Sequence, residues 1–366
     1  MVAFFALLRA GLWEKEVQLV PYGGFDFAEV KRLAEEQSVV GLIAAGLGHV
    51  TDMKPSKSDV LGIIGQTMQL EQRNITMNRF IAVLIDKLRK EGIYTLLVKG
   101  QGVALCYERP MWRSCGDVDL FLSDDNYDKA KTFLSPFATS IELEGAESKH
   151  LGMTISQWVV ELHGRLYSGL SSKIDKQLDD VYNDSFFRGK VRQWKNGETE
   201  VPLLAIENDV FYVFTHILQH FYKGGIGLRQ ICDWCRLLWT YRDSLDVAKL
   251  EGRLRRAGLM TAWKAFAAFA VEYLGMDAAA MPFYSDAAKW KRKASCIRRF
   301  VMSVGNMGHN RDLSYYEKYP YLIRKCISMG QRVGDLISHA RIFPLDSLRF
   351  FPRIMFNGLQ SAARGE

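Results

Sequence analysis

The chain has 366 residues, of which 48% are hydrophobic and 24% are charged. This composition excludes an intrinsically disordered protein, and the length exceeds what one compact core of ordinary size accommodates. A formal net charge of +7 and a pI near 9.0 favour an anionic partner such as a nucleotide, RNA or a membrane surface. Charge alone does not choose among these partners.

The cysteines and the apolar segments indicate a cytoplasmic protein. The six cysteines show no disulfide spacing, and the C-x-x-C of Cys232 and Cys235 has no second pair at zinc-finger spacing, which predicts two buried thiols. The opening MVAFFALLRAGLW has neither a basic start nor a small-residue cleavage site, so it predicts an amphipathic helix and not a secretory signal. No membrane span is expected, since Lys264 and Glu272 interrupt the most apolar later stretch.

Hydrophobic periodicity divides the chain into three regions. Residues 1–90 and residues 206–366 carry mainly helical patterns, and residues 91–205 carry strand signals between shorter helices. These patterns predict an α+β protein in which a small mixed-sheet core is flanked by N- and C-terminal helical regions.

Within the central region the elements follow one another closely. A helix ends near Gly92 and YTLLVKG follows as a buried strand; a short helix is expected to open after Gly100. DVDLFL and WVVELHGRL are read as two further strands. The pair Asn196-Gly197 lies between two strand-like runs and predicts a hairpin.

The sequence DVDLFL carries the strongest chemical signal. Side chains alternate faces along a strand, so Asp117 and Asp119 point one way while Val118 and Leu120 point to the other face. Carboxylates held this close repel each other, which makes sense if a divalent cation lies between them. Oxygen ligands favour Mg²⁺ or Mn²⁺.

Further residues complete a candidate site for a triphosphate. Glu161 is flanked by apolar residues on its strand and is expected as the third carboxylate; it or Asp119 would help orient or deprotonate an attacking hydroxyl. The turn at Lys99, Gly100 and Gln101 would bring a cation and free backbone N–H groups to phosphate oxygens. Arg113 would contact a phosphate or hold the acidic loop in place.

Histidines and a basic stretch invite other interpretations. His216 and His220 have i, i+4 spacing but no intervening glutamate, so buried polar contacts that dock the helical region are favoured over zinc. His163 is expected to face away from Glu161 and to be structural. The basic stretch between Lys289 and Arg299 could follow a phosphate backbone, but a solvated helix face is favoured.

The segments LLVKGQGVALCY, RSCGDVDLFL and ELHGRL resemble a bacterial nucleotidyltransferase family whose motifs read LKG, R-x-x-G-D-(I/V)-D-(I/L)-L and E-(L/I/V)-H-(W/G)-R-L. That family belongs to the DNA polymerase β-like superfamily, and the chain is also similar to AbiEii-type nucleotidyltransferases. The resemblance covers about residues 90–240 and includes HILQH with LRQICDWCRLL.

The resemblance implies a metal-dependent transfer of a nucleoside monophosphate from an NTP to a hydroxyl of a small molecule, a peptide or protein, or RNA. It places the metal carboxylates at Asp117, Asp119 and Glu161, and the phosphate-loop glycine at Gly100. The superfamily usually has Gly-Gly or Gly-Ser in that loop, whereas this chain has Gly100-Gln101. This departure supports the alternative of an inactive nucleotide-binding module. A D-x-D glycosyltransferase is disfavoured, because its nucleotide-binding domain would lie in the helical first region.

Overall fold

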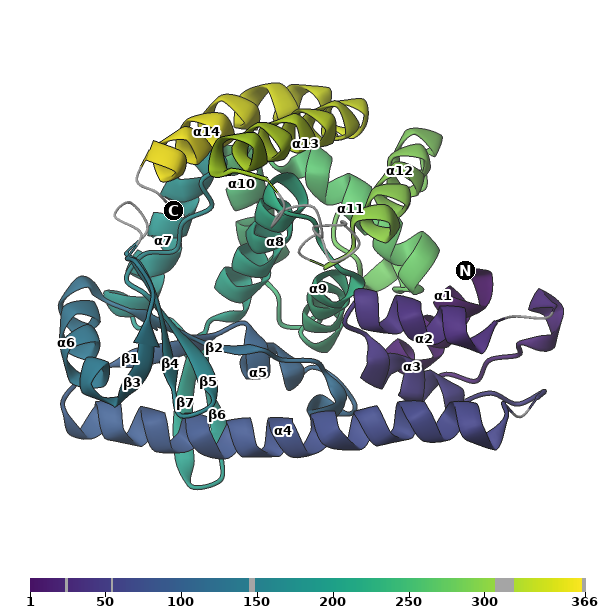
Figure 1. The fold of residues 1–366 in the computed structure, drawn as a ribbon, viewed down its shortest axis with the longest axis horizontal. Helices are drawn as coiled ribbons and strands as arrows, with labels where there is room; N and C mark the ends of the chain where they lie inside the picture. Colours follow the sequence, from purple (N-terminus) through teal and green to yellow (C-terminus); the bar gives the residue numbers. More distant parts are fainter. Residues whose placement is uncertain (24–25, 54, 145–148, 307–318, 364–366) are drawn as a thin grey trace.

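A helix of 34 residues, α4 (Lys57–Lys90), runs along one side of the molecule (Figure 1). At 1.5 Å per residue it is about 50 Å long. One half lies beneath the N-terminal helices and the other half supports the sheet. The computed structural model describes residues 1–366 apart from 24–25, 54, 145–148, 307–318 and 364–366.

The N-terminal helices are α1 (Val2–Trp13), α2 (Phe27–Glu36) and α3 (Val40–Leu47). The prediction of an amphipathic first helix was wrong: α1 is buried on nearly every side, because it packs against both α3 and α11. Its contact with α3 depends on glycine. A Cβ atom at Gly11 would lie 1.8 Å from the carbonyl oxygen of Leu42, so the two backbones approach this closely only without a side chain.

A seven-stranded sheet forms the centre of the molecule in the order β3-β4-β5-β2-β1-β7-β6. Neighbours pair antiparallel except β2 with β5 and β1 with β7, which are parallel, so the sheet is mixed. The strands are β1 (Thr95–Val98), β2 (Asp117–Leu122), β3 (Ala138–Ile141), β4 (His150–Ile155), β5 (Trp158–His163), β6 (Val191–Asn196) and β7 (Thr199–Leu204).

The two faces of the sheet pack against different helices. Val118 and Leu120 join a buried apolar cluster with the second half of α4, whereas Phe121 joins the cluster on the opposite face with α7 (Ser172–Phe186) and α8 (Ile206–Lys223). The alternation predicted for β2 is therefore confirmed. Asp117 and Asp119, which alternate with Val118 and Leu120, lie on the face covered by α8 and by α9 (Leu228–Thr240).

The hairpin predicted at Asn196-Gly197 is also confirmed. Strands β6 and β7 pair from Asn196 with Thr199, so Gly197 occupies the first central position of a two-residue turn. Its φ of 65° lies in the left-handed region, which glycine adopts without strain.

Helices make up most of the remaining chain and cover the sheet (Figure 1). Cys232 and Cys235 are fully buried on α9, as predicted. In the described part of the chain, no helix is long and apolar enough to cross a membrane. The remaining helices are α5 (Gly100–Ala104), α6 (Asp124–Leu134), α7 (Ser172–Phe186), α8 (Ile206–Lys223), α9 (Leu228–Thr240), α10 (Val247–Ala257), α11 (Met260–Leu274), α12 (Ala288–Val304), α13 (Tyr321–Ile342) and α14 (Pro344–Ala363).

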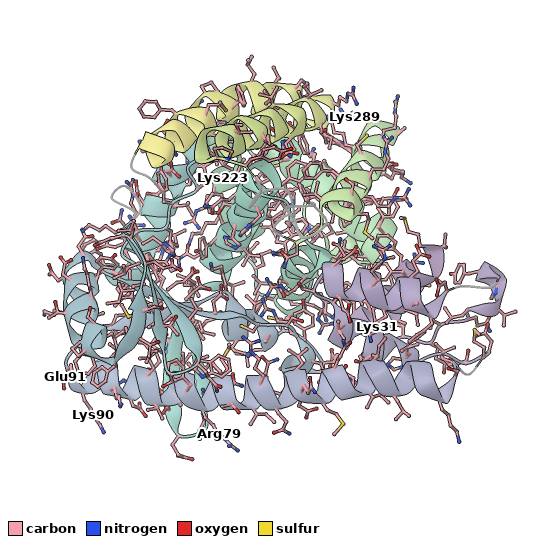
Figure 2. All side chains as sticks on the ribbon, in the orientation of Figure 1. Lys31, Arg79, Lys90, Glu91, Lys223 and Lys289 are labelled. Carbon is pink, nitrogen blue, oxygen red and sulfur yellow. The ribbon has the colours of Figure 1, made fainter. Side chains whose placement is uncertain are left out.

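Part of the basic stretch lies on the outer face of α12, where Lys289, Lys291 and Arg292 are exposed, whereas Lys293 and Arg298 are half-buried. Lys289 lies at the periphery of the molecule (Figure 2), and Lys291 pairs with Glu272 of α11 at 3.2 Å. The opposite side of α12 buries Ile297 and Val301 in the helical core. This alternation is typical of an amphipathic helix with a solvated face.

Candidate active site

Parallel pairing of β2 with β5 assembles the three predicted carboxylates. Asp119 lies opposite Glu161 in the register, and Asp117 shares the face of Asp119 because the two are separated by one residue. One oxygen from each of Asp117, Asp119 and Glu161 lies within 4.8 Å of the others. The predicted acidic cluster is therefore present in the structure.

The carboxylates of this cluster repel one another, and a bound cation would reduce that repulsion. The charge of Asp119 and then burial raise the pKa of Asp117 above its ordinary value. The side chain of Asp119 is 1% exposed to solvent. Hard oxygen donors at this separation, with repulsion among them, fit Mg²⁺ or Mn²⁺.

Lys99 supplies a positive charge to the same cluster. Its Nζ lies 2.7 Å from Oδ1 of Asp119. Burial disfavours the ammonium form, but attraction to Asp119 and the neighbouring anionic groups outweighs it and raises the pKa of Lys99. Lys99 adopts φ 55° and ψ −141°, a strained conformation for a residue with a side chain, and strain of this kind gathers at functional sites. The backbone of the Lys99-Gly100 turn thus aims the ammonium at the carboxylates.

The side chain of Gln101 points away from the carboxylates. Its amide nitrogen donates to Oδ1 of Asn74 on α4 at 2.9 Å, and the residue is 1% exposed. Gly100 has a φ of 40°, which suits glycine, and it lines the pocket beside Asp117. Lys99 and Gly100 therefore line the pocket where a ligand would contact them, while the Gln101 side chain joins the loop to α4 by a hydrogen bond.

Arg113 forms a buried ion pair that joins the sheet region to α9. Its Nε and Nη2 donate to the two carboxylate oxygens of Asp233 at 2.7 and 2.8 Å. Asp233 also accepts a hydrogen bond from the hydroxyl of Tyr107 at 2.7 Å. Burial lowers and the charge of Asp233 raises the pKa of Arg113, with the net effect upward. Of the two roles expected for Arg113, the observed contacts match the holding role, although the ion pair lines the pocket.

His163 belongs to the acidic cluster, and the expectation that it faces away from Glu161 was wrong. Residues two apart on a strand share a face. Nε2 of His163 lies 2.8 Å from Oδ1 of Asp119 and 3.5 Å from Oε2 of Glu161. Burial disfavours the imidazolium, but these two carboxylates raise the pKa of His163. A correct application of the strand period would have found this histidine.

His150 also reaches the cluster and was not predicted. It lies on β4 directly across from His163, and its Nε2 lies 3.1 Å from Oε2 of Glu161. Burial raises the pKa of Glu161. Hydrogen bonds from His150 and His163 and the charge of Lys99 lower this pKa by more than burial raises it, so Glu161 is held in its charged form. No local motif marks β4, so only the sheet pairing reveals His150.

Helices α8 and α9 close the opposite side of the pocket. Val213 and His216 come from α8, and Arg229 and Gln230 come from α9. Nη1 of Arg229 donates to the carbonyl oxygen of Ser114 at 2.8 Å, which fixes the guanidinium near the carboxylates. Arg229 is a pocket cation that was not among the predicted site residues, although it lies in LRQICDWCRLL, a segment that the resemblance covers.

His216 and His220 contact each other through their Nε2 atoms at 3.0 Å. Among the described residues, neither belongs to a group of three metal-ligating side chains. Burial and the charge of Lys99 lower the pKa of both, that of His220 to about 4. This contact lies within α8, so the expectation that the two histidines dock the helical region on the core stays a prediction.

The mixed sheet thus carries a D-x-D strand, a third acid on the parallel neighbour and a Lys-Gly turn beside them, as the nucleotidyltransferase resemblance implies. A family model described as "Uncharacterised nucleotidyltransferase" matches residues 23–275, and the chain belongs to this family. No curated protein matches the chain. A crystal structure of an antigenic nucleotidyltransferase-like protein from Paracoccidioides brasiliensis is similar at 16% identity and a TM-score of 0.31, over 50% of this chain and 90% of that one.

Proposed function

We propose that the protein transfers a nucleoside monophosphate from an NTP to a hydroxyl group of an acceptor, using Mg²⁺ or Mn²⁺ held by Asp117, Asp119 and Glu161. The observation that carries this proposal is the cluster of these three carboxylates, in which Asp117 and Asp119 line a pocket together with Lys99. Family membership supports the same reaction class. The DNA polymerase β-like and AbiEii-type resemblance of the motifs is consistent with it.

The reaction forms a bond between the acceptor oxygen and the α-phosphorus and breaks the bond from that phosphorus to pyrophosphate. Asp117, Asp119 and Glu161 would hold the divalent cation, which when bound would neutralise phosphate charge and favour ionisation of the hydroxyl. Lys99 and Arg229 line the pocket and supply fixed positive charge for the phosphate oxygens. Asp119 or Glu161 orients the hydroxyl and receives its proton, either directly or through water.

The acceptor belongs to one of three classes, namely RNA, a protein or peptide hydroxyl, or a small hydroxylated molecule. The pocket beside Asp117 and Asp119 has a volume of about 50 Å³, enough for a few water molecules or a phosphate group. The nucleoside and the acceptor would therefore extend beyond this enclosed space.

The alternative is a module that binds nucleotide without turnover. It is supported by the Gln101 side chain, which is hydrogen-bonded to Asn74 and does not face the carboxylates. Both functions need the same pocket but differ in pyrophosphate release. The D-x-D glycosyltransferase alternative has no support from the family to which the chain belongs.

The test is incubation of the full chain with each labelled NTP, Mg²⁺ or Mn²⁺, and acceptors of the three classes. Wild type is expected to release pyrophosphate and label one acceptor class, whereas a variant with Asp117→Asn and Asp119→Asn is expected to do neither. Asp125→Asn, an exposed acid on α6, is the matched control and should behave as wild type. Equal release by wild type and the double variant would refute the transferase, and nucleotide binding without release would favour the module.

A further inference from the structure

A second group of metal-ligating side chains adjoins the acidic cluster and is chemically unlike it. His150 on β4 lies opposite His163 on β5 in the antiparallel register, with ring centroids 4.8 Å apart. Both rings stand beside Glu161, and one ligating atom from each of the three residues lies within 4.8 Å of the others. The group therefore offers two imidazole nitrogens and one carboxylate oxygen.

Two distances in this group match those of a tetrahedral metal site, and Nε2 of His163 also lies 2.8 Å from Oδ1 of Asp119. A tetrahedral ion about 2.0–2.1 Å from its nitrogen and oxygen ligands keeps those ligands roughly 3.3–3.4 Å apart. Oε2 of Glu161 lies 3.1 Å from Nε2 of His150 and 3.5 Å from Nε2 of His163. Both histidines thus direct the same nitrogen to one oxygen, at separations that an ion can occupy with small adjustments.

The exposure of the three side chains also suits a metal site with an open position. His150 is 34% exposed, Glu161 26% and His163 11%. One side of the group is anchored in protein and the other is accessible to solvent. An arrangement with two histidines and one glutamate leaves a fourth position for water or substrate.

The donor set distinguishes this group from the one at Asp117 and Asp119. Imidazole nitrogen suits zinc and other first-row transition ions, whereas Mg²⁺ prefers oxygen ligands and dehydrates reluctantly. Glu161 belongs to both groups, so an ion at the histidines would also hold the carboxylate that the other group shares.

We propose that His150, Glu161 and His163 form a transition-metal site that binds a Zn²⁺-class ion, next to the Mg²⁺ or Mn²⁺ site and sharing Glu161 with it. This inference deepens the proposed function, but the binding of the second ion does not depend on nucleotidyl transfer. The two sites hold unlike ions because their donor atoms differ.

The test is titration of the metal-free full chain with Co²⁺ in the presence of saturating Mg²⁺. The visible absorption of Co²⁺ reports nitrogen ligation, and Mg²⁺ occupies the oxygen site. Wild type is expected to bind about one equivalent of Co²⁺ with these bands, and Zn²⁺ is expected to displace it. His150→Gln should weaken binding by at least ~10-fold, the loss seen even for residues that only support a metal ligand.

The control is His49→Gln, since His49 pairs with Glu14 at 2.6 Å without a second histidine. It should bind Co²⁺ as wild type does, and circular dichroism should show that both variants are folded. Equal Co²⁺ binding by wild type and His150→Gln, or no nitrogen-ligated Co²⁺ in wild type, would overturn the proposal. If the protein releases pyrophosphate but shows no nitrogen-ligated Co²⁺, the proposed function holds and the metal-site proposal fails. If it binds Co²⁺ but releases no pyrophosphate, the metal-site proposal holds and the proposed function fails.

Discussion

Asp117 and Asp119 occupy unequal surroundings although they share one strand face. Asp119 contacts Lys99 and His163, whereas Asp117 is repelled by Asp119 and partly buried, which raises its pKa. A carboxyl group with a raised pKa in the folded state costs free energy of folding at neutral pH; this cost shrinks as pH falls below that pKa and is absent below the ordinary value of 3.8.

We therefore predict that Asp117→Asn raises the melting temperature of the metal-free protein at pH 7 and lowers nucleotidyl transfer by about 100-fold or more, the scale of removing one fixed electrostatic contact to a transition state. Calorimetry without metal and pyrophosphate assays with Mg²⁺ measure the two effects. The stability difference should shrink on acidification. A lower melting temperature for the variant at pH 7 would contradict the electrostatic account.

The lowered pKa values of His216 and His220 predict that the folded protein loses stability at acidic pH. Burial and Lys99 depress the pKa of His220 from 6.5 to about 4, so the unfolded chain takes up this proton first. Stability is full above the unfolded pKa of 6.5 and falls as pH drops from there toward 4. The loss approaches ~3 kcal/mol for His220, at about 1.4 kcal/mol for each pH unit.

Urea unfolding at pH 7.5 and at pH 5.0 measures this dependence. The double variant His216→Gln and His220→Gln should lose less stability than wild type between these two pH values. Thr76→Ala, an exposed substitution that removes no titratable group, should keep the wild-type dependence. An unchanged pH dependence in the double variant would exclude these histidines as its source.

At the scale of elements, α4 supports the site through one buried side chain. Asn74 is fully buried; its Nδ2 donates to the carbonyl oxygens of Met111 and Arg113 at 2.7 and 2.8 Å, and its Oδ1 accepts from Gln101. One residue thus joins α4 to both segments that position the carboxylates.

We predict that Asn74→Ala lowers the free energy of unfolding by about 3 kcal/mol, because buried polar groups lose their partners. It should also weaken Mg²⁺-dependent nucleotide binding. Thr76→Ala, two residues away on the exposed side of α4, should change stability by less than ~0.5 kcal/mol. Similar losses for both variants in urea unfolding would contradict a specific role for Asn74.

The elements also show how far the sequence predicts the site. Local patterns are enough for β1, β2, β5 and the hairpin at Gly197, because side-chain period and turn residues are local properties. The strand β4, and with it His150, is not marked locally. The parallel register of β2 with β5, which sets Glu161 beside Asp119, depends on tertiary pairing and was only expected in outline.

For the whole molecule, the Arg113–Asp233 ion pair connects residues 120 positions apart and fastens α9 to the segment before β2. The sequence shows both residues but not their pairing. Asp233→Ala should destabilise the protein by about 3–5 kcal/mol, because it leaves a buried guanidinium without a partner.

The double variant Arg113→Met and Asp233→Leu removes both charges and should recover most of that loss in calorimetric unfolding. If the double variant is as unstable as Asp233→Ala, the loss does not come from the unpaired charge. Tyr107→Phe tests the remaining hydrogen bond to Asp233 and should cost only about 1 kcal/mol.

Nucleotidyl transfer is attack on the α-phosphorus of the NTP, and labelled nucleotide tests this directly. The full chain is incubated with Mg²⁺, the three acceptor classes and either α-labelled or γ-labelled NTP. The α-label is expected to become attached to the acceptor and the γ-label to leave as pyrophosphate, with neither event in the variant carrying Asp117→Asn and Asp119→Asn. Transfer of the γ-label to the acceptor, or no acceptor labelling with either NTP, would contradict nucleotidyl transfer.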